Sequence, residues 1–212
     1  MAFRTVQVER ALTHLKQADP VLESVIDRVG PFTLRAKRDR FAMLVRSILS
    51  QQISTKAANS IRNKLLARLK PATLNADSLN ELSDEDLRSV GLSGQKVRYL
   101  RDLIEHEQTG RIQLRTIGRR TDQEIIAELT QVKGIGEWTA QMFLIFSLGR
   151  MDVLPHADLG IRMALKNLYG LDELPNRVDV EQLAAPWRPF ATIASWYCWR
   201  SLELPSPIGS AE

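Results

Sequence analysis

The fold is decided by the stretch Val132-Lys133-Gly134-Ile135-Gly136-Glu137-Trp138-Thr139-Ala140. The spacing predicts a tight turn between two helices, because glycines such as Gly134 and Gly136 reach positive φ at no steric cost. The second helix should begin at the glycines, with its unpaired N–H groups and the positive end of its dipole facing outward. A helix start of this kind suits an anion such as a phosphate.

The sequence on either side of the turn supports two helices. Upstream, Thr121-Asp122-Gln123-Glu124 has the pattern of a capping box, so a helix should run from about 122 to 130. Downstream, the apolar run 138–148 ends at Gly149, a residue suited to the position after a helix. We therefore predict a helix-hairpin-helix element over about 122–149.

The rest of the chain also has helical patterns, and no segment alternates with the period of two that marks a strand. We predict an all-α protein of about ten helices. The other helices are expected at 5–18, 20–29, two within 39–70 joined by a bend at 50–54, one opening at 83–86, and then 95–108, 159–169, a short one capped by Asp179, and 190–203.

Composition restricts the class of protein and its location. The 212 residues are 44% hydrophobic and 25% charged, which is ordinary for a globular protein of one large or two small domains. No apolar run approaches the roughly 20 residues of a membrane span, and the N-terminus lacks the apolar core of a signal peptide. Cys198 is the single cysteine, which excludes an internal disulfide, a Cys-rich zinc site and a four-cysteine iron–sulfur cluster. We expect a cytoplasmic protein, associated with the nucleoid in a bacterium or nuclear in a eukaryote.

Positive charge is concentrated in one block. Residues 35–70 hold ten basic residues and one acid, Asp39, although the net charge of the whole chain is only +4. Such a block indicates a polyanionic partner, and it is equally compatible with a solvated helix face.

Two further features accompany the hairpin. Asp158 stands directly before an apolar helical run, where aspartate is a good N-cap, and a capping carboxylate can also face a cleft. The tryptophans at 138, 187, 196 and 199 are the other feature. Most tryptophans at helical spacing belong to a core. Trp138, however, lies in the first turn of the helix proposed for phosphate, where an aromatic ring suggests base stacking.

Together these motifs resemble the helix-hairpin-helix DNA glycosylases, and within them the DNA-3-methyladenine glycosylase II (AlkA-like) family. The resemblance covers roughly residues 35–204. It is carried by Leu49-Ser50-Gln51-Gln52-Ile53-Ser54, by Gly134 to Ala140, by Leu154-Pro155-His156-Ala157-Asp158-Leu159-Gly160, and by Trp187-Arg188-Pro189-Phe190 with Trp199.

The resemblance implies a fold of two lobes, 36–150 and 1–35 with 151–212, with the active cleft between them. It implies a monomer that acts on double-stranded DNA containing alkylated bases, in base excision repair, and that flips the damaged base into a pocket. Asp158 matches the catalytic aspartate of the family, and Gln52 matches the residue that fills the gap left by the flipped base.

Three sets of residues complete the expected site. The base pocket would be formed by Trp138, Met142 and Trp199. The hairpin would contact DNA through Lys133, Gly134, Gly136 and Thr139. No cofactor is required by this resemblance, but the carbonyls of Thr130, Val132 and Ile135 are candidates for binding a structural Na⁺ or K⁺.

The resemblance also bears on mechanism. Relatives that cut the DNA backbone carry a lysine two residues after the second glycine, and here that position is Trp138, which implies hydrolysis that leaves an abasic site. The chain departs from many relatives at Ala157, which replaces a second acid, and from one branch of the family at Met142, which aligns with an aromatic pocket position there.

Two alternatives remain open from the sequence. A non-catalytic helix-hairpin-helix protein that binds damaged DNA would have the same hairpin and basic block. A glycosylase for deaminated bases would need a proton donor for a neutral leaving group, and His156 is the candidate.

Overall fold

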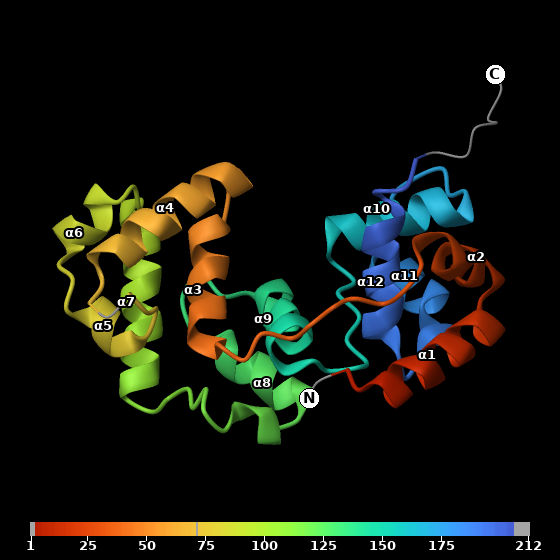
Figure 1. Ribbon diagram of the computed structural model, residues 1–212, viewed down its shortest axis with the longest axis horizontal. Helices are drawn as coiled ribbons and strands as arrows, with labels where there is room; N and C mark the ends of the chain where they lie inside the picture. Colours follow the sequence, from red (N-terminus) through yellow and green to blue (C-terminus); the bar gives the residue numbers. More distant parts are fainter. Residues whose placement is uncertain (1–2, 71, 206–212) are drawn as a thin grey trace. The chain divides into compact units, whose positions relative to one another are not determined.

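The computed structural model describes residues 3–70 and 72–205, and within these ranges it consists of helices and loops without a β-strand (Figure 1). The predicted all-α class is thereby confirmed. Contacts between Cα atoms divide the chain into unit 1, Met1–Ala36 with Gly149–Glu212, and unit 2, Lys37–Leu148. The lobes predicted from the sequence, 36–150 and 1–35 with 151–212, differ from these units by one residue at the first boundary and by two residues at the second. None of the helices in the described ranges combines the length and apolar character needed to cross a membrane.

Unit 1 is organised around a helix that is buried on all sides. Its elements are α1 (Thr5–Ala18), α2 (Pro20–Val29), α10 (Leu159–Tyr169), α11 (Arg177–Leu183), the 3-10 turn η3 (Ala185–Trp187) and α12 (Ala191–Ser201). Helix α12 packs against α1, α2 and α10, and its first eight residues are all buried. A helix that is apolar all round belongs in a core.

The core of unit 1 contains large side chains from most of its elements, among them Leu15, Ile161, Trp187 and Tyr197. Burial of each such apolar side chain contributes about 1.5–3 kcal/mol of transfer free energy. This packing fixes the start of α10 relative to the end of α12, which positions two predicted site residues.

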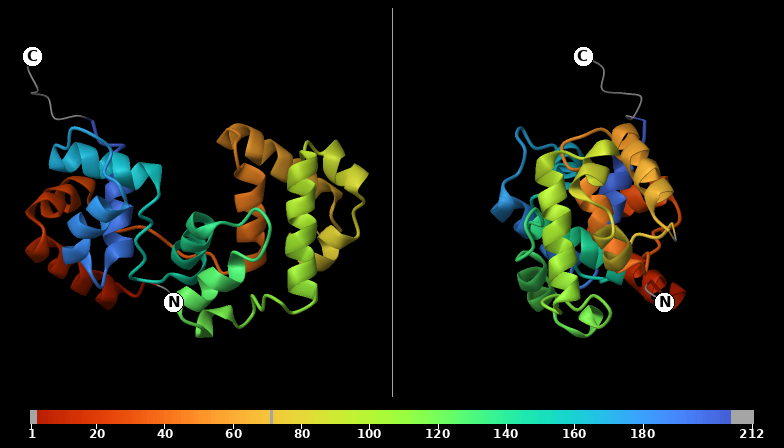
Figure 2. Two further views of the ribbon diagram at one scale, coloured as in Figure 1. Left: turned by 180° about the vertical axis from the view of Figure 1, so that it is seen from behind. Right: turned by 90° about the vertical axis from the view of Figure 1, so that its left-hand side faces the viewer.

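In unit 2, three other helices pack against the long helix α7. Its elements are α3 (Arg40–Ser50), α4 (Thr55–Arg68), α5 (Ala76–Asn80), α6 (Asp84–Ser89), α7 (Gly94–Gln108), η1 (Ile117–Arg119), α8 (Asp122–Leu129), α9 (Glu137–Phe143) and the π-helical turn η2 (Leu144–Leu148). Helices α3, α5 and α6 contact α7, and α9 contacts both α3 and α8 (Figure 2). The hairpin of α8 and α9 is therefore part of the core of unit 2.

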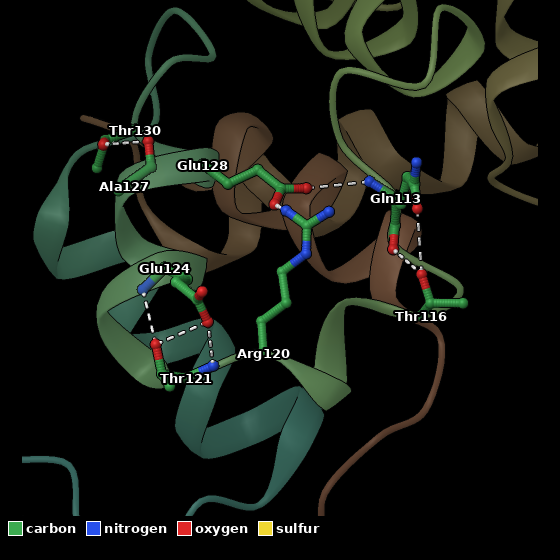
Figure 3. Close-up of polar contacts among 8 residues, drawn as sticks. All are labelled: Gln113, Thr116, Arg120, Thr121, Glu124, Ala127, Glu128 and Thr130. Atoms are coloured by element: carbon green, nitrogen blue, oxygen red, sulfur yellow. Dashed lines mark hydrogen bonds and ion pairs between the residues drawn. The ribbon is translucent and has the colours of Figure 1, made fainter.

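Helix α8 is fixed at its start and on its inner face. Thr121 and Glu124 form the predicted capping box, in which each side chain accepts the backbone N–H of the other residue. Glu128, which is 6% exposed, accepts the backbone N–H of Gln113 at 3.1 Å and forms an ion pair with Arg120 (Figure 3). The first helix of the hairpin is thus anchored to the loop that precedes it.

Three expectations about the helices need correction. Helix α5 was not expected, because its five residues are too few for an apolar period and only its Asn75 capping box marks it. The cap of α11 is Asn176, and Asp179 is instead the third helical residue of that capping box. The apolar run after the hairpin is α-helical only to Phe143 and then widens into the π-turn. The described ranges hold twelve α-helices, two more than the roughly ten expected.

Candidate active site

Asp158 lies at the N-cap of α10, as the sequence predicts. Its Oδ1 accepts the backbone N–H of Ile161 at 3.0 Å and the indole N–H of Trp199 at 2.8 Å. Two donors on one oxygen fix the orientation of the carboxylate, because a hydrogen bond is strongly directional. The side chain is half-buried at the surface of unit 1.

Gly160 allows Trp199 to approach this carboxylate. A Cβ atom at Gly160 would lie 2.9 Å from Cδ1 of Trp199 and 3.0 Å from Oδ1 of Asp158. Real Cβ atoms essentially never come as close as the first of these distances, and the second is tight, so a larger residue would require the indole or the carboxylate to shift. The motif Asp158-Leu159-Gly160 therefore positions the carboxylate and leaves room for the residue that holds it.

Trp199 has a role that the sequence did not indicate. It was expected as an aromatic wall of a base pocket, and in unit 1 it is partly buried with its N–H on Asp158. The two residues are 41 positions apart, so no local pattern could have linked them. The pocket role remains a prediction, and the contact with Asp158 is a finding.

The two glycines of the hairpin serve different purposes. Gly134 has φ +84°, and a Cβ there would lie 2.2 Å from the ring of Tyr99. The turn therefore needs glycine at this position. The expectation that Gly136 also adopts positive φ was wrong: its φ is −94° with ψ 176°, an extended conformation open to any residue.

Gly136 is the N-cap of α9 and provides no side-chain cap. Apart from Gly136 itself and its neighbours along the chain, no atom of the described residues lies within 4 Å of a Cβ built on it. Neither backbone strain nor packing therefore requires glycine there. A missing side chain at the start of a helix allows a ligand to approach the backbone closely.

Thr139 and Lys133 flank this helix start, and both were expected to contact DNA. The side chain of Thr139 is 5% exposed, so only its backbone N–H, in the first turn of α9, is placed for such a contact. Lys133 has a side chain that is 74% exposed, and its Nζ lies 3.0 Å from Oδ1 of Asp102. A phosphate bound here would share the ammonium of Lys133 with the carboxylate of Asp102.

Asp102 of α7 holds the start of the turn. Its Oδ2 accepts the backbone N–H of Lys133 at 2.9 Å and lies 3.4 Å from Nδ1 of His106. Burial by itself would raise the pKa of Asp102, but the N–H and ammonium of Lys133 outweigh it, so the pKa lies below its ordinary value. Asp102 could not be identified from the sequence, because an aspartate inside a helix gives no sign of its partner 31 residues later.

Gln52, predicted to fill the gap of the flipped base, lies in the bend between α3 and α4. It is exposed and has φ +56°, which is uncommon for a residue other than glycine. Such a strained backbone persists only where the surroundings impose it, and it is most frequent at functional sites.

A hollow in unit 2 brings several predicted residues together. This cavity of about 450 Å³ is lined by, among others, Gln52, Lys96, Gly134 and Trp138. Trp138 is 46% exposed, so it does not belong to the core, in contrast to Trp187 at 0%. Met142, one turn further along α9, is 6% exposed and faces the interior of unit 2. Unit 2 thus contains the hairpin, Gln52 and Trp138, and unit 1 contains Asp158 and Trp199.

The candidate cation ligands lie in the same turn. Thr130, Val132 and Ile135 fall within six residues after α8, and the turn is closed by the Ile135 N–H, which donates to the Val132 carbonyl at 3.0 Å. A carbonyl oxygen has a second lone pair, so that bond does not prevent Val132 from binding a cation. Oxygen donors of this kind fit a hard ion.

Part of the basic block has a structural role. The guanidinium of Arg40 donates to the carbonyls of Leu114 and Arg115, and Arg68 pairs with Asp86 at 2.7 Å. Burial and the neighbouring Arg62 lower the pKa of Arg46. Other members of the block are exposed and could meet a polyanion, namely Arg35, Lys37, Arg38, Lys56, Lys64 and Lys70.

Comparison with known proteins identifies the family. A model of the HhH-GPD superfamily of base excision DNA repair proteins matches residues 45–189. The chain belongs to this superfamily. The match spans the bend with Gln52, the whole hairpin and Asp158, and it ends before Trp199. The family predicted from the sequence is confirmed.

Similar members of the superfamily come from yeast and bacteria. DNA-3-methyladenine glycosylase 1 of Schizosaccharomyces pombe is 34% identical over 92% of this chain and 88% of its own length. The structure of Mag1 from the same organism, in complex with abasic DNA, matches with TM-score 0.82 and 33% identity over 92% of this chain and 97% of that one. A DNA-3-methyladenine glycosidase from Bacillus halodurans matches with TM-score 0.80 and 36% identity over 89% and 87% of the two chains.

Proposed function

We propose that this protein is a monofunctional DNA glycosylase of base excision repair. It binds double-stranded DNA, flips out alkylated purines such as 3-methyladenine or 7-methylguanine, and hydrolyses the N-glycosidic bond to leave an abasic site. The observation that carries the proposal is Asp158, held by Trp199 and Ile161 in a chain of the HhH-GPD superfamily. The names of the relatives, DNA-3-methyladenine glycosylases, support the choice of substrate.

The chemistry needs little from the protein beyond a carboxylate. An alkylated purine carries positive charge on its ring and is therefore a good leaving group that needs no general acid. As the bond to C1′ breaks, positive charge develops on the sugar, and the carboxylate of Asp158 stabilises that charge or orients the attacking water. A carboxylate already fixed by two donors needs no reorganisation as the charge develops.

Trp138 is the proposed aromatic contact of the flipped base. Trp138 is 46% exposed at the start of α9 and lines the cavity of unit 2, so its side chain is accessible to a ligand. A cationic base over an indole gains about 0.5–2 kcal/mol from the cation–π interaction, which a neutral base lacks. This contact favours alkylated over normal purines by charge.

Trp138 also supports the monofunctional assignment. Strand cleavage by a glycosylase proceeds through an amine that forms a Schiff base with the abasic sugar, and an indole at this position has no amine to form one. Water is then the nucleophile, and the product is an intact strand with an abasic site.

The hairpin is the proposed contact with the DNA backbone. The first-turn N–H groups of α9 face a helix start without a side-chain cap, where a phosphate oxygen can accept them. A Na⁺ or K⁺ on the carbonyls of Thr130, Val132 and Ile135 would hold the turn and add positive charge beside that phosphate.

A base-release assay tests the proposal. Duplex DNA treated with a methylating agent is incubated with the purified protein, and free bases are separated by chromatography. We expect release of 3-methyladenine and 7-methylguanine, with strand breaks only after the abasic sites are cleaved with alkali. Tight binding to the same duplex without any free base would favour the non-catalytic DNA-binding alternative.

A further inference from the structure

We infer that Gln51 is a positioning residue that ties the turn carrying Gln52 to the turn of the hairpin. The inference rests on the proposed function, in which Gln52 enters the duplex and the hairpin holds the backbone. Gln51 has no expected role of its own, and it touches neither reacting atoms nor, in this proposal, DNA.

The link is one hydrogen bond between two distant turns. The Nε2 amide of Gln51 donates to the carbonyl of Gly134 at 2.7 Å, across 83 residues of sequence, and the contact is partly buried. The acceptor defines which end of the amide points there, because a carbonyl oxygen cannot donate. The next residue in the chain is Gln52, with its positive φ.

The bond fixes the plane of one peptide group. The Gly134 carbonyl and the Ile135 N–H belong to the same planar unit. Gln51 binds the carbonyl at 2.7 Å, and the Ile135 N–H donates to the Val132 carbonyl at 3.0 Å. This peptide is therefore held at both ends, and it lies one peptide group before Gly136, the N-cap of α9.

Each turn also has its own anchor on α7. On the side of Gln52, Nζ of Lys96 donates to the carbonyl of Leu49 at 2.7 Å. On the hairpin side, Asp102 accepts the N–H of Lys133, and the ring of Tyr99 packs on Gly134. Removal of the Gln51 amide should thus leave both turns folded on α7 but without the direct bond that couples their motions. Insertion of Gln52 at the lesion would then no longer be coupled to binding of the DNA backbone by the hairpin.

The test compares full-length wild type with Gln51→Ala and Gln51→Glu. Alanine removes the donor, and glutamate keeps the size of the side chain but places an acceptor against the Gly134 carbonyl. Gln113→Ala is the matched control, because that amide side chain lies on an exposed loop of the same unit near Thr116. Two quantities are measured: hydrogen exchange of the Ile135 and Gly136 amides without DNA, and the affinity for a duplex with a tetrahydrofuran abasic-site analogue relative to the undamaged duplex.

Loss of one hydrogen bond predicts a change of roughly two- to tenfold. In Gln51→Ala we expect faster exchange at Ile135 by about that factor, and a fall in the affinity ratio of similar size. Gln51→Glu should show at least as large an effect, and Gln113→Ala none. Unchanged exchange in both Gln51 variants would overturn the inference, and so would faster exchange with an unchanged ratio, since Gln51 would then be only a structural contact. If wild type itself does not prefer the abasic duplex, the proposed function fails, and the exchange measurement still decides whether Gln51 positions the hairpin.

Discussion

The indole Nε1 of Trp199 lies 2.8 Å from Oδ1 of Asp158, and the same unit contains a second pair of this kind, in which Nε1 of Trp187 lies 2.8 Å from Oδ2 of Asp19. The second pair is in the core: Trp187 is 0% and Asp19 6% exposed, and Asp19 also caps α2. The first pair is at the surface. The same hydrogen bond from an indole N–H to a carboxylate thus occurs at the proposed catalytic residue Asp158 and at the structural residue Asp19.

The two pairs give a matched prediction for Trp→Phe substitutions. Trp199→Phe removes a donor to a carboxylate, an interaction of about 1.5–3 kcal/mol, so base release should slow by roughly ten- to a hundredfold while the affinity for undamaged duplex is kept. Trp187→Phe should instead lower the free energy of unfolding, because it leaves a cavity in the core and removes one of the two donors to Oδ2 of Asp19, the other being the Tyr169 hydroxyl. Single-turnover assays measure the rate of base release, and urea unfolding measures stability. If base release slowed equally in two equally stable variants, Trp199 would have no special role.

Alanine at each hairpin glycine should affect a different property. Gly134→Ala must fit a Cβ 2.2 Å from the Tyr99 ring at φ +84°, so we expect a loss of about 2–4 kcal/mol in the free energy of unfolding. Gly136→Ala meets nothing within 4 Å at φ −94°, so the protein should stay as stable as wild type. Its new methyl group should nevertheless weaken duplex binding by about tenfold or more, because it occupies the space a phosphate needs.

Urea unfolding and fluorescence anisotropy with labelled duplex separate the two outcomes. Full DNA affinity in Gly136→Ala would remove the helix start of α9 from the list of backbone contacts.

Gln52 allows a test of strain at a functional position. Both Gln52→Ala and Gln52→Gly lose the side chain that fills the gap, so both should bind the abasic-site duplex more weakly than wild type. Glycine adopts φ +56° without the Cβ penalty, so Gln52→Gly should be more stable than Gln52→Ala by about 1 kcal/mol. Thermal and urea unfolding give the comparison, and a more stable alanine variant would show that the backbone is relaxed there in solution.

The Asp102–Lys133 contact predicts sensitivity to acid. The pKa of Asp102 lies below its ordinary 3.8 in the folded protein, so its contribution is fully present above pH 3.8 and is lost as the pH falls through the folded value. Asp102→Asn should reduce the free energy of unfolding at pH 7 by about 1 kcal/mol, since the amide still accepts the Lys133 N–H but lacks the charge.

The difference between wild type and Asp102→Asn should shrink when unfolding is repeated below pH 3. The exposed Asp172 provides a control, because Asp172→Asn should leave the free energy of unfolding unchanged both at pH 7 and below pH 3. A difference that stays constant from pH 7 to pH 2.5 would show that the charge of Asp102 does not stabilise the hairpin.

Features with a local cause could be predicted from the sequence. The start of α8 at Thr121 and the extent of α10 from Asp158 to Gly170 follow from caps and stops within a few residues, and both are confirmed. The recurrence of apolar residues every three to four positions identified most helices for the same reason. The motifs shared with the family also indicated Asp158 and the hairpin from the sequence alone.

Features that join distant segments could not be predicted. The bonds from Trp199 to Asp158, from Lys133 to Asp102 and from Gln51 to Gly134 cross 41, 31 and 83 residues. Each connects residues whose own neighbourhoods are ordinary, so only the packed structure reveals them. The role of Gly136 was misjudged for a related reason, because the sequence does not distinguish a glycine needed for its φ from one needed for its missing side chain.

Asp158 is the proposed catalytic residue, and the substitution Asp158→Asn tests this role. An asparagine keeps an oxygen that can accept from Ile161 and Trp199, so the N-cap and the fold should persist. The measurement is single-turnover release of 3-methyladenine and 7-methylguanine from methylated duplex, alongside binding to the tetrahydrofuran duplex. We predict that release is abolished while the duplex is still bound. Release at the wild-type rate by a folded Asp158→Asn protein would contradict it.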